Sequence, residues 1–159
     1  MPTFYYIIPA AISLAAVVMA FCRRLPAAAV AFVSMLGAAA FGWAVFPTGQ
    51  YWFWGIAALI VTVNLYLGSR PPLTALRLYT AGGALAGSVV GAVAGSMAAL
   101  IIGGAIGAFL GFEAFRRTPA GRMNATFSQR LAIFADLAIP AMVTFFIVII
   151  TFAQLPLFR

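Results

Sequence analysis

The chain has 159 residues, of which 65% are hydrophobic and 7% are charged, and it carries a net charge of +7 at a mean hydropathy of +1.13. A water-soluble domain contains about 25% charged residues, so this composition excludes a soluble globular protein. The positive charge comes from arginine alone and lies in short segments between apolar runs, not on a soluble basic face of the kind that binds nucleic acid. We therefore expect an all-α, polytopic membrane protein that forms a single domain and contacts the lipid bilayer but no nucleic acid.

Long apolar runs predict the membrane spans. A helix needs about 20 apolar residues to cross a hydrocarbon core about 30 Å thick. The first run is followed, not preceded, by Arg23 and Arg24, so we expect a retained span and not a cleaved signal peptide. The predicted full spans, about four in number, cover residues 3–21, 27–46, 51–67 and 131–152.

Residues 69–80 form the main break in the apolar pattern. Pro71 and Pro72 exclude a continuous helix, because proline lacks an N–H group and its ring clashes with the preceding turn. Arg70 and Arg77 flank a short stretch that we expect to lie along the membrane interface.

A ladder of small residues follows between residues 81 and 115, with one member every four positions. Such spacing leaves one helix face without side-chain bulk, so that another backbone can approach closely. The pattern predicts a close helix contact within a hairpin, with a second copy, or with another membrane subunit. The members of this glycine ladder are Gly83, Gly87, Gly91, Gly95, Ala99, Gly103, Gly107 and Gly111.

The length of the ladder segment predicts that it folds back on itself. As one helix, its roughly 35 residues would extend about 52 Å, far more than the hydrocarbon core. A turn near residues 95–97 would divide it into a glycine-zipper hairpin of two helices, residues 81–96 and 98–115, which are short enough to be re-entrant. The positive-inside rule favours this hairpin, because it returns the later arginines to the cytoplasmic side.

The resulting topology places both chain termini outside and the arginine loops in the cytoplasm. Arginines at the inner surface set orientation, and they are also candidates for binding anionic lipid headgroups. The arginines in question are Arg23, Arg24, Arg70, Arg77, Arg116, Arg117, Arg122 and Arg130.

Three polar side chains within apolar segments are candidate functional residues. Asp136 lies in the last span, where a charge is costly to desolvate, so we expect it to pair with an arginine near the headgroups or to serve a proton or cation. Glu113 precedes Arg116 and Arg117 at helix spacings of three and four, which predicts an ion pair. Asn64 in the third span predicts an interhelical hydrogen bond or, alternatively, a place along a pathway.

The sequence offers no recognisable catalytic or metal-binding set. Histidine and lysine are absent, Cys22 is the single cysteine, and there are two acidic residues, so no nucleophile–base pair, Walker loop or cysteine-based metal cluster is predicted. Gly103, Gly104 and Gly107 lie in apolar membrane sequence, which disfavours a phosphate-binding glycine loop. We expect a protein that is not an enzyme and that needs no metal or cofactor.

The glycine ladder ends at residues 107–113 in the sequence GAFLGFE. This stretch, the four-residue glycine register and the order of spans resemble a bacterial family of small integral membrane proteins, domain of unknown function 456, whose glycine-rich segment ends in a similar GAFLGE-like stretch. The chain departs from that pattern by one extra residue before the acid, and by GSM at residues 95–97 where the family has a turn that contains Gly-Pro. The resemblance implies architecture and a bacterial inner (cytoplasmic) membrane, but no activity.

Two functional hypotheses follow from these patterns. The first is a non-enzymatic, polytopic inner-membrane protein whose glycine hairpin provides close helix packing, self-association or binding of a partner subunit. The alternative is a small oligomeric channel or transporter that uses the interrupted hairpin and Asp136, because broken helices in membrane proteins often mark a transport site.

Overall fold

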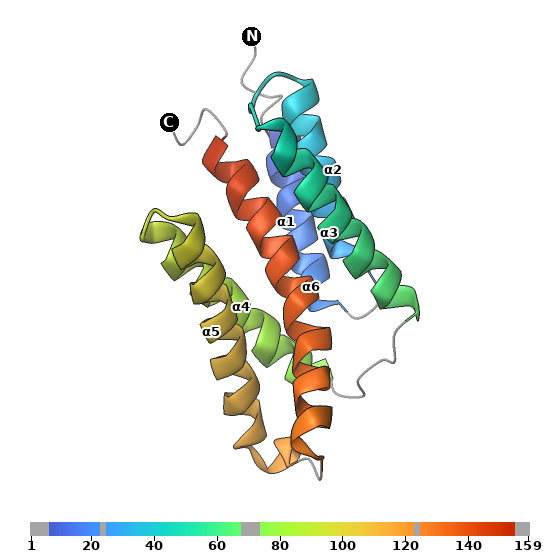
Figure 1. Ribbon diagram of the computed structural model, residues 1–159, viewed down its shortest axis with the longest axis vertical. Coiled ribbons are helices and arrows are strands. Elements are labelled where there is room, and N and C mark those ends of the chain that lie inside the picture. The colour runs from blue at the N-terminus through green and yellow to red at the C-terminus, as the bar shows by residue number, and fades with distance from the viewer. Residues whose placement is uncertain (1–6, 23–24, 68–73, 123–124, 155–159) are drawn as a thin grey trace. The chain divides into compact units, whose positions relative to one another are not determined.

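The computed structural model of the chain describes residues 7–22, 25–67, 74–122 and 125–154 (Figure 1). Throughout these residues the fold is helical, which confirms the all-α prediction. Helices α3 to α6 are each long and apolar enough to cross a membrane, as expected for a polytopic protein. The helices Ile7–Phe21 and Ala27–Ala40 are apolar but shorter than these four, so the predicted full spans at residues 3–21 and 27–46 are not matched by helices of spanning length. The helices are α1 (Ile7–Phe21), α2 (Ala27–Ala40), α3 (Thr48–Leu67), α4 (Thr74–Val93), α5 (Met97–Arg116), the short 3-10 helix η2 (Pro119–Gly121) and α6 (Phe127–Gln154).

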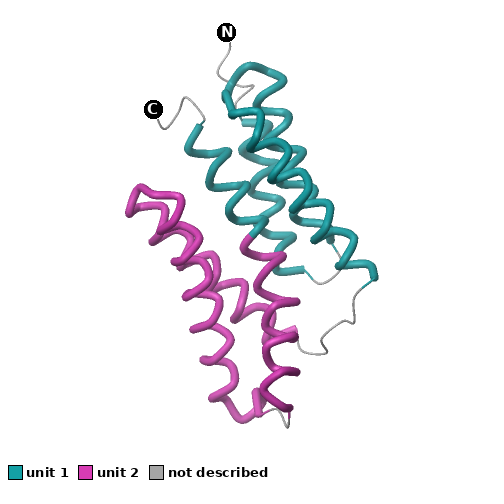
Figure 2. Tube along the Cα trace, in the orientation of Figure 1, with its two compact units in different colours: residues 1–67, 143–159 teal, residues 68–142 magenta. Residues whose placement is uncertain are grey.

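The chain forms two compact units (Figure 2). Unit 1 contains residues 1–67 and 143–159, and therefore α1, α2, α3 and the C-terminal part of α6. Unit 2 contains residues 68–142, and therefore α4, α5, η2 and the N-terminal part of α6. The expectation of one membrane domain stays a prediction.

Within unit 1, two buried serines join α1 to α2. The hydroxyl groups of Ser13 and Ser34 lie 2.8 Å apart, and Ser34 also donates to the carbonyl oxygen of Pro9 at 2.8 Å. Both serines are buried, so these bonds satisfy polar atoms that would otherwise be costly in an apolar interior. Between α2 and α3 an apolar groove of about 560 Å³ is lined by residues that include Phe32 and Gly55.

Helix α2 ends at Ala40, earlier than the residue 46 expected from the apolar pattern. Gly42 adopts a φ of 69°, a left-handed conformation that glycine takes at little cost. Its N–H bonds to the Ala39 carbonyl at 2.9 Å, and the N–H of Trp43 bonds to Ala38 at 2.9 Å. This pair of bonds is the Schellman motif, which satisfies the last carbonyls of a helix and stops it.

The ladder segment folds as two helices, with the turn at residues 94–96. Gly95 has a φ of 76° and its N–H bonds to the Ala92 carbonyl at 2.9 Å. Ser96 then caps α5, because its hydroxyl accepts a hydrogen bond from the N–H of Ala99 at 3.0 Å. A glycine that closes one helix and a serine that opens the next are the local signals that place this turn.

The first helix of the hairpin begins at Thr74 and not at residue 81. Residues 74–80, expected along the interface, instead belong to α4, because the buried positions Leu76, Thr80 and Ala81 continue the helical face that the ladder occupies. Helices α4 and α5 each contain 20 residues, or about 30 Å. Both are therefore long enough to cross the hydrocarbon core, in contrast to the short arms expected from the sequence.

Local contacts fix the end of α5 with η2 and the start of α6. Thr126 and Gln129 form a capping box, in which Gln129 Oε1 accepts from the Thr126 N–H at 3.0 Å and Thr126 Oγ1 accepts from the Gln129 N–H at 3.4 Å. This arrangement begins α6 at Phe127, before the expected residue 131. At Gly121 a Cβ atom would lie 2.0 Å from the carbonyl oxygen of Phe115, so a side chain there would displace η2 from the end of α5.

Candidate functional site

The two helices of the hairpin touch through glycine at matched positions. A Cβ atom built on Gly83 would lie 2.1 Å from the carbonyl oxygen of Gly107, and one built on Gly107 would lie 2.1 Å from that of Gly83. Gly87 and Gly103 are related in the same way, at 2.0 and 2.4 Å. Real Cβ atoms do not approach a backbone oxygen this closely, so any side chain at these positions would separate the helices.

The outer contacts extend the same register to both ends of the hairpin. A Cβ on Gly91 would lie 2.2 Å from the Ala99 carbonyl oxygen, and one on Gly111 would lie 2.1 Å from that of Tyr79. The contacts are nested symmetrically about the turn. Gly95 is the exception in the ladder: it forms the turn, and no heavy atom lies within 4 Å of its Cβ position.

This geometry directs one hydrogen of each packed glycine at a carbonyl oxygen of the other helix. Such Cα–H···O contacts recur at close helix–helix interfaces and contribute about 0.5–1 kcal/mol each. Close approach also adds van der Waals contact, which drives helix association in lipid, where the hydrophobic effect between helices is lost. The ladder positions other than Gly95 thus meet one another inside the hairpin.

A second candidate site is a pocket of about 160 Å³ between α5 and the first turns of α6 (the charged pocket). All of its lining residues belong to unit 2. Its charged members are Glu113 and Arg116 at the end of α5 and Arg130 in the first turn of α6, and its apolar wall includes Phe109, Phe127, Leu131 and Phe134.

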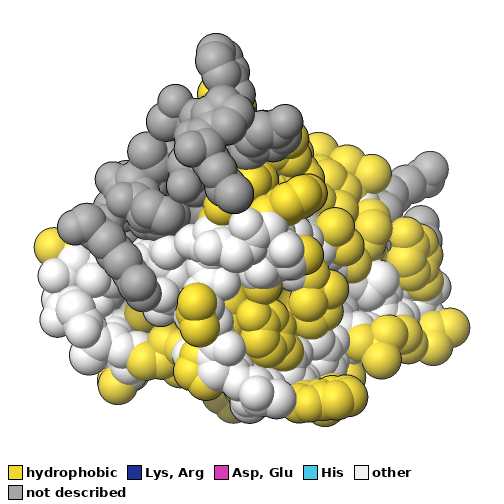
Figure 3. All heavy atoms as spheres, turned by 90° about the horizontal axis from the view of Figure 1, so that it is seen from above, with side chains coloured by type: hydrophobic (Ala, Val, Ile, Leu, Met, Phe, Trp, Pro, Cys, Tyr) yellow, Lys and Arg dark blue, Asp and Glu magenta, His cyan; other side chains and the backbone are white. Residues whose placement is uncertain are grey.

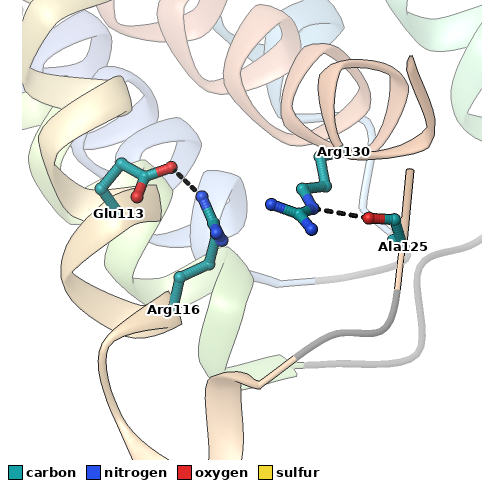
Figure 4. Close-up of polar contacts among 4 residues, drawn as sticks. All are labelled: Glu113, Arg116, Ala125 and Arg130. Carbon is teal, nitrogen blue, oxygen red and sulfur yellow. Dashed lines mark hydrogen bonds and ion pairs between the residues drawn. The ribbon is translucent and has the colours of Figure 1, made fainter. Parts of the chain in front are cut away.

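Figure 4 shows the three charged side chains of the pocket. Arg116 donates from Nη1 to Glu113 Oε1, and both side chains are less than one-third exposed. Arg130 donates from Nε to the carbonyl oxygen of Ala125 at 2.7 Å, and one of its terminal nitrogens lies on the side of Arg116 and Glu113 (Figure 4). The pocket is therefore lined by one carboxylate and two guanidinium groups.

Aromatic contacts hold α5 and α6 together around the charged pocket. Phe134 of α6 packs edge-on against Phe112, with ring centres 5.4 Å apart, and against Phe109 at 6.1 Å. Phe112 and Phe115 also belong to a buried cluster with Leu76. Edge-to-face pairs of this kind contribute about 0.5–1.5 kcal/mol beyond the apolar area that they bury, so these contacts stabilise the packing of α5 against α6 at the pocket.

The remaining predicted polar residues lie elsewhere. Asp136 is exposed on α6, about 13 Å along the helix from Phe127. Asn64 is exposed on α3, whereas the sequence led us to expect a buried amide between helices. The face of α3 that carries Asn64 is exposed, since the apolar residues Ile60 and Leu67 on the same face are exposed as well.

The predicted arginines divide between described and undescribed residues. Arg117 and Arg122 are exposed, and Arg77 is half-buried on α4. Arg23, Arg24 and Arg70 lie outside the described residues.

Comparison of the chain with models of protein families, with curated proteins and with solved structures finds no match. The resemblance to domain of unknown function 456 stays a prediction. Function is therefore inferred from the geometry of the hairpin and of the charged pocket.

The helix spacing predicted an ion pair of Glu113 with Arg116 or Arg117, but the aromatic residues around this pair were not predicted. Phe109 and Phe112 stand three apart on α5, and Phe127, Leu131 and Phe134 are spaced by four and three on α6. These spacings place each set on one helix face. They are the pattern in the sequence from which the aromatic wall of the pocket could have been predicted. Whether the aromatic faces of α5 and α6 pack against each other, however, depends on how η2 orients the chain after α5.

The described surface is rich in exposed apolar side chains. Hydrophobic atoms gather on the face seen in Figure 3, and among the described residues no Arg, Asp or Glu is visible there. On the hairpin, Val90 is 71% and Val93 is 84% exposed. Large apolar side chains at this exposure are suited to lipid, and helices of this length and composition support contact with a bilayer.

Proposed function

We propose that the chain is a non-enzymatic, polytopic inner-membrane protein whose glycine-ladder hairpin is a rigid element for association with a second copy or another membrane subunit. The observation that carries the proposal is the reciprocal contact of Gly83 with Gly107 and of Gly87 with Gly103. Close backbone packing makes the two helices one stiff body, and stiffness lowers the entropic cost of binding a further helix.

The hairpin's outer face is the surface on which such association would occur. The ladder glycines already pack against the opposite helix of the hairpin. They therefore cannot receive a helix from another subunit. Exposed side chains on the outer face are apolar and modest in size, among them Val89, Val90 and Ile106. A helix from a second copy could pack on this face without burying a charge.

The experiment combines crosslinking with disruption of the ladder. In a Cys22→Ser background, Val90→Cys should give a crosslinked dimer in membranes, because Val90 is on the outer face. Adding Gly107→Leu should remove that dimer by forcing α4 from α5. The matched pair is Gly107→Ala and Gly82→Ala. The first places a Cβ 2.1 Å from the Gly83 carbonyl oxygen and should also remove the dimer, whereas the second adds a Cβ where no heavy atom lies within 4 Å and should leave it.

One result would contradict the proposal, and a second would restrict it to association with a different subunit. A dimer that survives Gly107→Leu, in a protein whose thermal stability is also unchanged, would show that the ladder does not hold the hairpin. Absence of crosslinked product at every cysteine placed along the outer face, with the protein intact, would remove self-association and leave a different subunit as the partner to identify by native mass spectrometry.

The alternative of a channel or transporter depended on short, interrupted hairpin helices and on Asp136. Helices α4 and α5 each contain 20 residues, which removes the first of these reasons. Asp136 is exposed on α6 and is the residue on which a transport hypothesis now depends. Flux into liposomes that is unaffected by Asp136→Asn would count against it.

A further inference from the structure

We propose that the charged pocket binds an anionic phospholipid, with its phosphate between Arg116 and Arg130 and an acyl chain against the phenylalanine wall. This site is independent of the association proposed for the hairpin. It concerns a different face, between α5 and α6, and a different class of ligand.

The first reason is the charge balance of the pocket. Arg116 and Arg130 both line it, with Arg116 turned toward Glu113 and Arg130 beside them (Figure 4), and Glu113 is the carboxylate among the lining residues. Two like charges that line one partly buried site repel each other, and one carboxylate neutralises only one of them. A bound anion removes the excess positive charge and the repulsion together.

The second reason is the supply of hydrogen-bond donors. A guanidinium group has five N–H donors in a fixed fork. Arg116 directs Nη1 to Glu113, and Arg130 directs Nε to Ala125. The terminal nitrogens of Arg130, which lines the pocket, extend beyond that bond, and one of them lies on the side of Arg116 and Glu113 (Figure 4). A phosphate group matches this fork, because its oxygens accept paired hydrogen bonds from arginine.

The third reason is the apolar wall beside the charges. Phe109 lies about 10 Å before Arg116 along α5, and Phe134 lies about 6 Å beyond Arg130 along α6. Since α5 runs toward the arginine end and α6 runs away from it, both phenylalanines are deeper than the arginines. Phe109 and Leu131 are 53% and 55% exposed, so an acyl chain below the phosphate would cover apolar surface.

A phospholipid fits this arrangement better than a free anion. Arg116 is the last residue of α5 and Arg130 is in the first turn of α6, the depth at which headgroups meet a membrane helix. Inorganic phosphate would use the arginines and leave the apolar wall uncovered. The pocket, at about 160 Å³, accommodates the headgroup phosphate, and the chains would extend along the groove outside it.

The experiment measures lipid retention by the full-length protein. Native mass spectrometry of detergent-solubilised protein is titrated with phosphatidylglycerol and, separately, with phosphatidylcholine of identical acyl chains. We expect tighter retention of phosphatidylglycerol. Arg130→Gln and Arg116→Gln should each lower that retention about fivefold, the effect of removing about one arginine's attraction to an anionic lipid. Arg122→Gln, an exposed arginine outside the pocket, should leave it unchanged.

The Glu113→Gln variant distinguishes a lipid-binding site from an ion pair that has only a structural role. Loss of the competing carboxylate should raise retention of phosphatidylglycerol at least twofold. Arg130→Lys, which keeps the charge but not the fork, should retain more lipid than Arg130→Gln. Circular dichroism of each variant confirms that its helical content is that of the unaltered protein, and the Glu113→Gln and Arg116→Gln results stand even where Arg130→Gln does not fold.

Three outcomes would overturn the inference. Equal retention of the two lipids by the unaltered protein would remove the anionic preference. An equal loss in Arg122→Gln would assign the effect to general surface charge. Displacement of phosphatidylglycerol by millimolar inorganic phosphate, with no contribution from the acyl chains, would make the pocket a site for a soluble anion.

Discussion

At Gly83 the feature that matters is the absence of a side chain. The adjacent Gly82 is one position away on the same helix, yet its Cβ position is open whereas that of Gly83 lies 2.1 Å from the Gly107 carbonyl oxygen. The two residues have the same intrinsic helix propensity and differ in what they face. They therefore separate the effect of backbone packing from that of helix propensity.

Gly83→Ala should destabilise the protein by about 1–3 kcal/mol, the usual cost of inserting bulk into a packed contact. Gly82→Ala should be neutral or stabilising by up to about 1 kcal/mol, because alanine favours a helix more than glycine does. Unfolding by denaturing detergent in bicelles measures both. Equal effects of the two substitutions would show that the hairpin contact contributes nothing specific.

Glu113 and Arg116 show how a local pattern can be right and still incomplete. Their spacing of three predicts an ion pair on one helix, and the structure pairs them. Such pairs stabilise by only about 0.2–0.5 kcal/mol. What the spacing could not indicate is the approach of Arg130 from α6, which gives the pair its place in a pocket.

At the scale of the element, helix ends are decided by one or two residues each. The capping box of Thr126 and Gln129 begins α6, and the left-handed Gly42 and Gly95 end α2 and α4. These signals are local and chemical, so a sequence contains them. Apolar periodicity alone predicts helix ends poorly, because an apolar residue can occur both inside a helix and in the turn that follows it.

Thr126→Ala should weaken the start of α6 by about 1 kcal/mol through loss of the cap. Ser128→Ala should cost less, because Ser128 contacts the Thr126 hydroxyl at 3.2 Å and serves no backbone N–H there. Amide hydrogen exchange at residues 127–131 would detect the faster opening. Protection that is the same in Thr126→Ala as in the unaltered protein would contradict the role of the cap.

At the scale of the whole chain, charge placement in unit 2 supports the topology with arginines in the cytoplasm. The end of the hairpin at residues 94–96 carries no charge, whereas Arg77, Arg116, Arg117, Arg122 and Arg130 belong to the other end. From the positive-inside rule we expect that end to face the cytoplasm. Full-length helices α4 and α5 make both crossings long enough for a hydrocarbon core.

Reporter fusions test this topology directly. A fusion after Ser96 should be active as an alkaline phosphatase and silent as a green fluorescent protein, and a fusion after Gly121 should behave in the opposite way. Fusions after Gln50 and Arg159 serve as controls for the outer side. The same compartment for Ser96 and Gly121 would mean that α5 does not cross.

The sequence by itself determined the class of the protein and the presence of the hairpin. Composition leaves too little polar surface for water, and a ladder segment longer than a bilayer is thick has to fold back. Both conclusions depend on composition and on segment length, which are sums over the residues of the chain. They do not require knowledge of which distant residues meet.

Only the tertiary structure decided the partners. It paired Gly83 with Gly107, drew residues 74–80 into α4, left Asn64 exposed and brought Arg130 to Arg116. Each outcome depends on contacts between residues far apart in sequence, and these are selected by the packing of whole helix faces. A helix pattern states which residues share a face, but the fit of one face on another is a property of the assembled fold.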